Sequence, residues 1–245
     1  MMTRRSTWAG CSGKGNCLSI MILLPVLLLP VLFCTVLPAA AAEFPEGVVE
    51  YRGPISAEHN RQFLAAIADR PLQRLSITSS GGEVEAAIAL GEWVFARRLD
   101  IEVPDYCLSS CANYVFPAGR HKRVHAGAVV AWHGNYRHLQ QTGLWRDDVT
   151  ARMQRLGEDR QAASRYVRAQ VAYLTGLERD IFARIGVDER LCWIGKMPPY
   201  NVPDYYFLST HDMARFGIDQ VQVPPDYART DVSRFADSIV YIRLE

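Results

Sequence analysis

The stretch LQRLSITSSGGEVEAAIALGEWVFAR, residues 72–97, decides the fold class. Its first part, residues 72–78, is rich in apolar and β-branched residues and predicts a strand. Its last part, from about residue 83 to 97, repeats apolar residues at helical spacing and predicts a helix. Between them, Ser79-Ser80-Gly81-Gly82 allows backbone amides to approach a ligand at a helix N-terminus, although a plain strand-to-helix turn uses the same residues.

The same alternation of strands and helices continues on both sides of this stretch. Upstream, residues 57–70 predict a helix with one apolar face, and Ser56 is a plausible N-cap. The other elements that we expect before His133 are a short strand near 47–55, a strand at 101–103, a helix beginning within 107–116 and a buried strand at 124–132. This order is typical of an α/β domain.

Beyond His133 the pattern becomes mainly helical. Residues 134–145 are polar and turn-rich, which predicts a loop or a lid. A long helix from Asp147 or Asp148 to about residue 174, and a shorter one at 177–185, predict a helical arm at about 147–186. A helix at 210–216 and a strand at 218–223 complete the expected elements, so we predict one domain over residues 43–245.

The first 42 residues differ in composition from the rest. Three basic residues and no acid precede an apolar run at 18–37, and four alanines end at Ala42. This pattern is typical of a secretory signal peptide cleaved after Ala42. The alternative is an uncleaved anchor in the inner membrane, because twenty residues rise ~30 Å as a helix, which is enough to span a bilayer. We therefore expect a periplasmic or secreted protein, which contacts a membrane only if the leader remains.

Charge and cysteine content exclude several classes of partner. Without the leader's three basic residues, 24 Lys and Arg stand against 26 Asp and Glu, so we expect no binding to nucleic acid. Cys107, Cys111 and Cys192 follow the leader, and their odd number leaves at least one thiol unpaired within the chain. Cys111 has either of the other two as a possible partner. No set of His and Cys residues has the spacing of a four-ligand zinc site, so we expect no metal. We also expect no cofactor.

Two adjacent serines and one histidine carry the possible chemistry. Ser109 and Ser110 fall where a helix is expected to begin, and a serine there is commonly only a cap. At that place a hydroxyl also lies beside unsatisfied helix amides, which can stabilise an oxyanion. A serine hydroxyl needs a base at neutral pH, and His133, at the end of an apolar strand, is the candidate.

The order of these features resembles that of the Clp-protease/crotonase superfamily, and most closely the exported relatives of the Clp protease proteolytic subunit. Ser79-Ser80-Gly81-Gly82 matches the family's Ser-Pro-Gly-Gly loop, with Ser80 in place of proline. Counting back from Ala118-Gly119 gives Ser110 as the family's nucleophile, and His133 matches its histidine. The resemblance covers about residues 48–135 and resumes at 207–219. It implies an α/β fold of repeated β-β-α units.

The resemblance implies a Ser-His-Asp hydrolase with a backbone oxyanion hole. Ser110 would be the nucleophile and His133 the general base, while the amides of Gly82 and Cys111 would bind the oxyanion. Because Cys-x-Ser-Ser-Cys replaces the family's small apolar residues, Ser109 is an alternative nucleophile, and the adjacent amide would then be that of Ser110.

The acid of the triad is less clearly placed. The family has an aspartate just before the segment that corresponds to residues 207–209, and Asp204 lies one residue too early for a match without a gap. Asp180 is the alternative acid. A Ser-Lys dyad would need a lysine, but neither Lys122 nor Lys196 is at a recognisable position.

We therefore expect an exported serine hydrolase, specifically a peptidase that acts on a peptide or protein substrate. Arms such as residues 147–186 commonly mediate ring or trimer assembly in this superfamily, so the resemblance also implies a homo-oligomer. The alternative is a catalytically inactive member that keeps the fold as a binding or assembly module, because a fold does not fix function. An acyl-CoA enzyme fits an exported chain poorly, since CoA esters are cytoplasmic.

Overall fold

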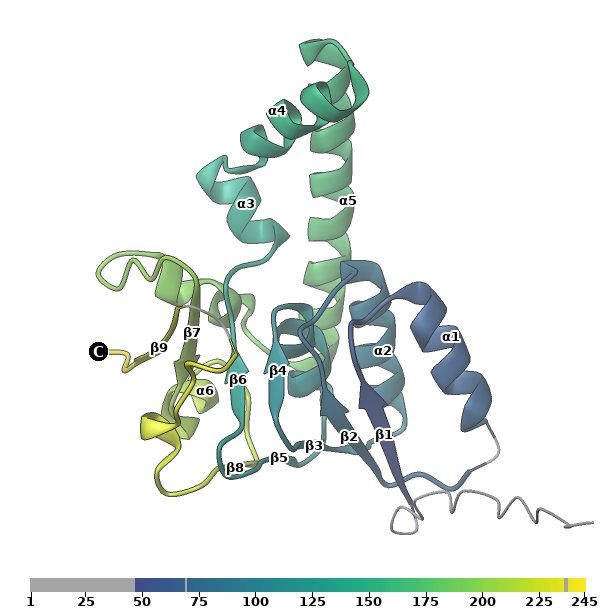
Figure 1. Ribbon diagram of the computed structural model, residues 1–245, viewed down its shortest axis with the longest axis vertical. Helices are drawn as coiled ribbons and strands as arrows, with labels where there is room; N and C mark the ends of the chain where they lie inside the picture. The colour runs from purple at the N-terminus through teal and green to yellow at the C-terminus, as the bar shows by residue number, and fades with distance from the viewer. Residues whose placement is uncertain (1–46, 69, 236–237) are drawn as a thin grey trace, which may run out of the picture. The chain divides into compact units, whose positions relative to one another are not determined.

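The computed structural model describes residues 47–68, 70–235 and 238–245, which belong to one compact unit. A five-stranded sheet forms its centre, and each neighbouring pair of strands is parallel. In spatial order (Figure 1) the strands are β1 (Val48–Arg52), β2 (Arg74–Thr78), β3 (Asp100–Val103), β5 (Lys122–Val124) and β8 (Val221–Gln222). The expected α/β fold is confirmed, and its main sheet is parallel.

Two further parallel pairs continue from this sheet. Strand β4 (Tyr106–Leu108) pairs with β6 (Val129–Ala131), and β7 (Tyr205–Leu208) pairs with β9 (Ile239–Ile242). Single bridges connect these pairs to their neighbours: Ser79 pairs with Cys107, and Trp132 pairs with Tyr206. As a result, strands β2, β4 and β6 present their carboxyl ends at one edge of the structure (Figure 1).

Helices α1 (Ala57–Ala66) and α2 (Val84–Ala96) connect the first three strands. The expected cap of α1 is confirmed, because the Ser56 hydroxyl accepts a hydrogen bond from the His59 amide at 3.1 Å. Helix α2 packs closely on the turn that follows β4. A Cβ atom at Gly91 would lie 2.2 Å from the Tyr114 carbonyl oxygen, so only glycine allows this approach.

Three helices form the arm: α3 (Tyr136–Thr142), α4 (Trp145–Leu156) and α5 (Arg160–Ile185), as Figure 1 shows. The expected loop at 134–145 is wrong, because the Asn135 side chain accepts the His138 amide at 2.9 Å and caps α3. The expected helix from Asp147 or Asp148 to about residue 174, followed by a second helix at 177–185, is also wrong, because the division lies earlier in the chain. Gly157, at φ +66°, ends α4, and Asp159 caps a continuous α5.

The segment after β4 differs from the expected helix at 107–116. Its first residues form β4, and the chain then turns through a π-helical segment, Cys111–Val115, and a 3₁₀ turn, Phe116–Ala118. The expected strand at 124–132 is divided into β5 and β6. Helix α6 (Thr210–Ala214) agrees with the expected helix, whereas the sequence did not indicate β9.

No helix of the described residues is long and apolar enough to cross a membrane. The proposed leader, residues 1–42, lies outside the part of the chain that the structure describes.

Candidate active site

The candidate site lies at the carboxyl ends of β2, β4 and β6. Because parallel strands end at a common edge, the residues that follow them are brought together. The loop 79–82 follows β2, Ser109 follows β4, and His133 lies two residues beyond β6. Residues far apart in the sequence therefore meet through strand pairing.

Ser109, rather than Ser110, contacts the histidine. The Ser109 Oγ lies 2.7 Å from His133 Nε2, within hydrogen-bond distance. The Ser110 hydroxyl instead donates to the Gly82 carbonyl oxygen at 2.9 Å, and the Ser110 residue is only 4% exposed. This geometry corrects the expectation that Ser110 meets His133 and favours the alternative, Ser109.

The backbone at Ser109 explains why the two hydroxyls diverge. Ser109 has φ +55°, a left-handed conformation that residues with a side chain rarely adopt. Its amide donates to the Ala131 carbonyl at 3.2 Å, and its own carbonyl accepts from the Asn113 amide at 2.8 Å. These two bonds hold a strained turn at the point where strand becomes helix.

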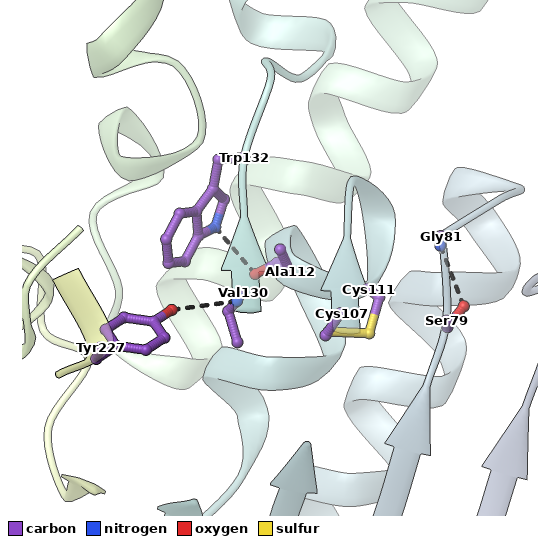
Figure 2. The surroundings of a disulfide bond; sticks show 8 residues. All are labelled: Ser79, Gly81, Cys107, Cys111, Ala112, Val130, Trp132 and Tyr227. Atoms are coloured by element: carbon purple, nitrogen blue, oxygen red, sulfur yellow. Dashed lines mark hydrogen bonds between the residues drawn. A yellow bond between two sulfur atoms is a disulfide. The ribbon is translucent and has the colours of Figure 1, made fainter. Parts of the chain in front are cut away.

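A disulfide closes this turn. Cys107 and Cys111 are bonded, with their Cα atoms 5.3 Å apart, and Figure 2 shows the bond between the end of β4 and the following helical turn. Both half-cystines are fully buried, and Cys192 is a buried free thiol whose pKa is raised by burial. Of the two pairings left open for Cys111, the structure has the one that encloses both serines.

The glycine loop packs against the serine turn. Gly81 and Gly82 have φ +86° and +151°, and a Cβ at Gly81 would lie 2.8 Å from the Ser110 nitrogen. The Ser79 hydroxyl accepts from the Gly81 amide at 3.1 Å, a bond drawn in Figure 2. Ile55 holds the other side of the loop, because its amide donates to the Gly81 carbonyl at 2.8 Å. Glycine is therefore required where the two backbones touch.

His133 is held in a partly buried environment that favours its neutral form. Burial lowers the pKa of the imidazole, and the nearby charge of Lys196 lowers it further. The Asp204 carboxylate opposes both effects. The ring lies against Tyr205, with centroids 4.5 Å apart. A neutral imidazole at neutral pH is the form that can accept a proton from Ser109.

The two acid candidates have different surroundings. Asp204 acts electrostatically on His133, but within the described residues its carboxylate forms no hydrogen bond with the ring. Asp180 is exposed on α5 and pairs with Arg179 at 2.8 Å, and it is not among the residues that line the site. The structure therefore leaves Asp204 as the only one of the two near the histidine.

Lys196, which the sequence did not place at the site, lies close enough to His133 to affect its pKa. Its Nζ donates to the carbonyl oxygens of Pro203 at 2.8 Å and Asp204 at 3.0 Å, which ties the Asp204 segment in place. Lys196 also lowers the pKa of His133. The turn Ile194–Lys196 packs against β7, where a Cβ atom at Gly195 would lie 2.5 Å from the Tyr206 ring, and no local sequence pattern reports that contact.

A pocket of about 330 Å³ opens beside the two serines. Its walls come from the glycine loop, the serine turn, the segment after β6 and the arm helices α3 and α4. The polar and titratable side chains of its lining include Ser109, Asn113, His133, Tyr136, His138 and Asp148. The size lies at the lower end of the range for small-molecule sites, ~300–1,000 Å³.

A buried carboxylate joins the pocket wall to the arm. Glu178, on α5, is fully buried and accepts hydrogen bonds from the Tyr114 hydroxyl at 2.5 Å and from the amides of Tyr136 at 3.0 Å and Arg137 at 2.9 Å. Burial raises the pKa of this carboxyl, and the three donors oppose the rise. Two of these partners, Tyr114 and Tyr136, line the pocket, so α5 fixes part of its shape.

Metal ligation has no support in the described residues, where no three His, Cys, Asp or Glu side chains gather in a way that could hold an ion. No protein-family model matches this chain. A search of curated proteins also gives no match.

Proposed function

We propose that this protein is a serine hydrolase, specifically a peptidase, with Ser109 as nucleophile and His133 as general base. One observation carries the proposal: the 2.7 Å contact between Ser109 Oγ and His133 Nε2 at the edge where three parallel strands end. Ser109 is partly exposed beside a pocket, whereas Ser110 is buried and bonded to a backbone carbonyl. A nucleophile needs both a base within reach and access to substrate.

The expected chemistry is acyl transfer in two steps. Ser109 Oγ attacks the substrate carbonyl carbon while its proton moves to His133 Nε2. The tetrahedral intermediate then breaks its bond to the leaving group, which takes the proton from His133. Water attacks the acyl-serine in the second step, gives a proton to His133 and releases the acid with return of the proton to Ser109.

The oxyanion would be bound by backbone amides. With Ser109 as nucleophile, the adjacent donor is the Ser110 amide, at the first turn of the helical segment, in place of the Cys111 amide. The second donor is the Gly82 amide in the loop that touches this turn. Asp204 is the proposed acid and acts by stabilising the protonated histidine. In a known triad, loss of the acid cost less than loss of serine or histidine.

The resemblance to exported relatives of the Clp protease proteolytic subunit supports the same proposal. We retain from it a crotonase-like fold, an exported location, a peptide or protein substrate and assembly into a homo-oligomer. The structure has the α/β architecture that the resemblance implies. A second candidate, an inactive binding module, is favoured by one observation: among the described residues, no carboxylate is hydrogen-bonded to His133.

A fluorophosphonate probe, which labels activated serines, tests the proposal. We expect the wild-type chain to be labelled, the Ser109→Ala and His133→Ala variants to lose labelling, and the Ser110→Ala variant to retain most of it. Ser110→Ala is the matched control because it removes a neighbouring hydroxyl that does not touch the base. Loss of labelling only in Ser110→Ala would move the nucleophile by one residue, and an unlabelled wild-type protein would favour the binding module.

A further inference from the structure

The pocket beside Ser109 has one side chain that is charged at neutral pH among its described lining residues. That side chain is Asp148, in the first turn of α4. The two histidines of the lining, His133 and His138, have pKa values lowered by burial and by Lys196, so both are neutral there. A pocket with a single carboxylate is complementary to a cation.

Asp148 has no cationic partner within the described part of the chain. It takes part in no ion pair, and the neighbouring Arg152 is already held by Glu158 through two contacts of 2.8 and 2.7 Å. Asp148 is exposed and lines the pocket, so its carboxylate is accessible to a ligand there.

Three carboxylates act on one wall of the pocket, at Tyr136. Burial raises the pKa of Tyr136, a pocket residue at the start of α3, and Asp148, Glu178 and Glu85 raise it further. Asn113 adds a buried side-chain oxygen that has no hydrogen-bond partner among the described residues, while its amide nitrogen donates to the Gly134 carbonyl at 2.9 Å. On this wall, the nearby carboxylates and the unpaired oxygen favour a hydrogen-bond donor that carries positive charge, whereas the charge of Lys196 acts on His133 and His138.

Asp148 also has a structural effect on its own helix, which is distinct from contact with a ligand. Aspartates in the first turn of a helix stabilise it by interaction with the helix dipole. Asp147 occupies the same turn of α4 and has the same sequence environment, but it does not line the pocket. The two neighbouring aspartates therefore form a matched pair, in which only Asp148 can contact a ligand beside Ser109.

We propose that the pocket takes the lysine or arginine side chain of a peptide substrate, with Asp148 as the carboxylate that pairs with it. The proposal rests on the proposed function, since it places the scissile carbonyl at Ser109 and the basic side chain toward α4. The selectivity of the hydrolase would then come from the arm, whereas its chemistry comes from the edge of the sheet.

Matched substrates test the proposal. We compare kcat/KM for N-acyl lysine and norleucine thioesters, and for the arginine and citrulline pair, with wild-type protein and the Asp148→Asn and Asp147→Asn variants. We expect the wild type to favour the cationic member by on the order of tenfold to a hundredfold, as for a charge-assisted hydrogen bond. Asp148→Asn should abolish this preference, and Asp147→Asn should keep it.

A binding measurement makes the result independent of turnover. In the Ser109→Ala background, calorimetry should detect benzamidine but not the uncharged benzamide, and Asp148→Asn should remove the difference. Fluorophosphonate labelling of Ser109 without a preference for cations would overturn this proposal and leave the proposed function intact. Binding of benzamidine without labelling would support the pocket and overturn the hydrolase. Equal loss in both aspartate variants would assign Asp148 to the helix dipole alone.

Discussion

At the scale of single residues, the site depends on which of two adjacent serines faces the base. The backbone of Ser109 adopts φ +55° and directs its hydroxyl to His133, whereas the next residue, Ser110, is turned toward the Gly82 carbonyl. Two opposite charges also affect the pKa of the base, His133. Lys196 lowers the pKa of His133 and Asp204 raises it, so these two residues allow a test in both directions.

We expect the pH dependence of Ser109 labelling to follow the pKa of His133. The reaction needs neutral imidazole, so its rate falls as the pH drops through that pKa. Lys196→Gln removes a positive charge, which raises the pKa of His133 and shifts the acid limb to higher pH. Asp204→Asn removes a negative charge and shifts the limb to lower pH. The measurement is the second-order rate constant of fluorophosphonate labelling against pH, and shifts of the same sign in both variants would contradict the electrostatic account.

At the scale of elements, the turn from β4 into the π-helical segment holds the nucleophile. The disulfide between Cys107 and Cys111 spans this turn and encloses both serines. A short covalent loop limits the conformations available to the unfolded chain and restrains the native turn. The bond therefore links stability to the position of the Ser109 hydroxyl.

We expect a Cys107→Ser, Cys111→Ser double variant to lose about 2 kcal/mol of unfolding free energy, the loop-entropy estimate for so short a ring. Ser109 labelling should slow by roughly tenfold or more, because small displacements of a reacting group are costly. Urea unfolding and the labelling rate measure the two effects. Cys192→Ala is the control, since it removes a buried thiol and leaves the disulfide in place. Wild-type labelling by the double variant would show that the bond does not position Ser109.

At the scale of the whole molecule, α5 connects the other two helices of the arm to the catalytic edge. Glu178 is the point of contact, where one buried carboxylate receives a tyrosine hydroxyl and two backbone amides at the start of α3. Helix α3 begins just after His133 and Gly134, with Asn135 as its N-cap. Changes in the arm can therefore reach the pocket through this carboxylate.

We expect Glu178→Gln to lower the free energy of unfolding by roughly 2–3 kcal/mol, because an amide places a donor opposite groups that already donate. Labelling of Ser109 should also slow, since Tyr114 and Tyr136 lose a common anchor. Chemical unfolding and labelling rates test this. Glu92→Gln is the control: Glu92 pairs with Arg184 of α5 at 3.7 Å on the surface, and such exposed pairs contribute about 1 kcal/mol or less. Equal losses in the two variants would contradict the special role of Glu178.

The sequence by itself determined the alternation of strands and helices, the Ser-Gly-Gly turn, and the candidates Ser109, Ser110 and His133. These features are local, because apolar periodicity and turn residues act within a few positions of the chain. Tertiary structure decided the rest. The choice of Ser109 follows from one strained backbone angle, set by bonds to β6 and to the helical turn.

The positions of the other site residues also depend on distant segments. Strand pairing brings His133 to the serine turn, the fold of residues 194–204 brings Lys196 and Asp204 near the ring, and α4 brings Asp148 to the pocket. No local pattern reports these contacts, because they join residues tens of positions apart and depend on the packing of whole elements. The sequence thus specified the chemical groups, and only the folded chain determined which of them face one another.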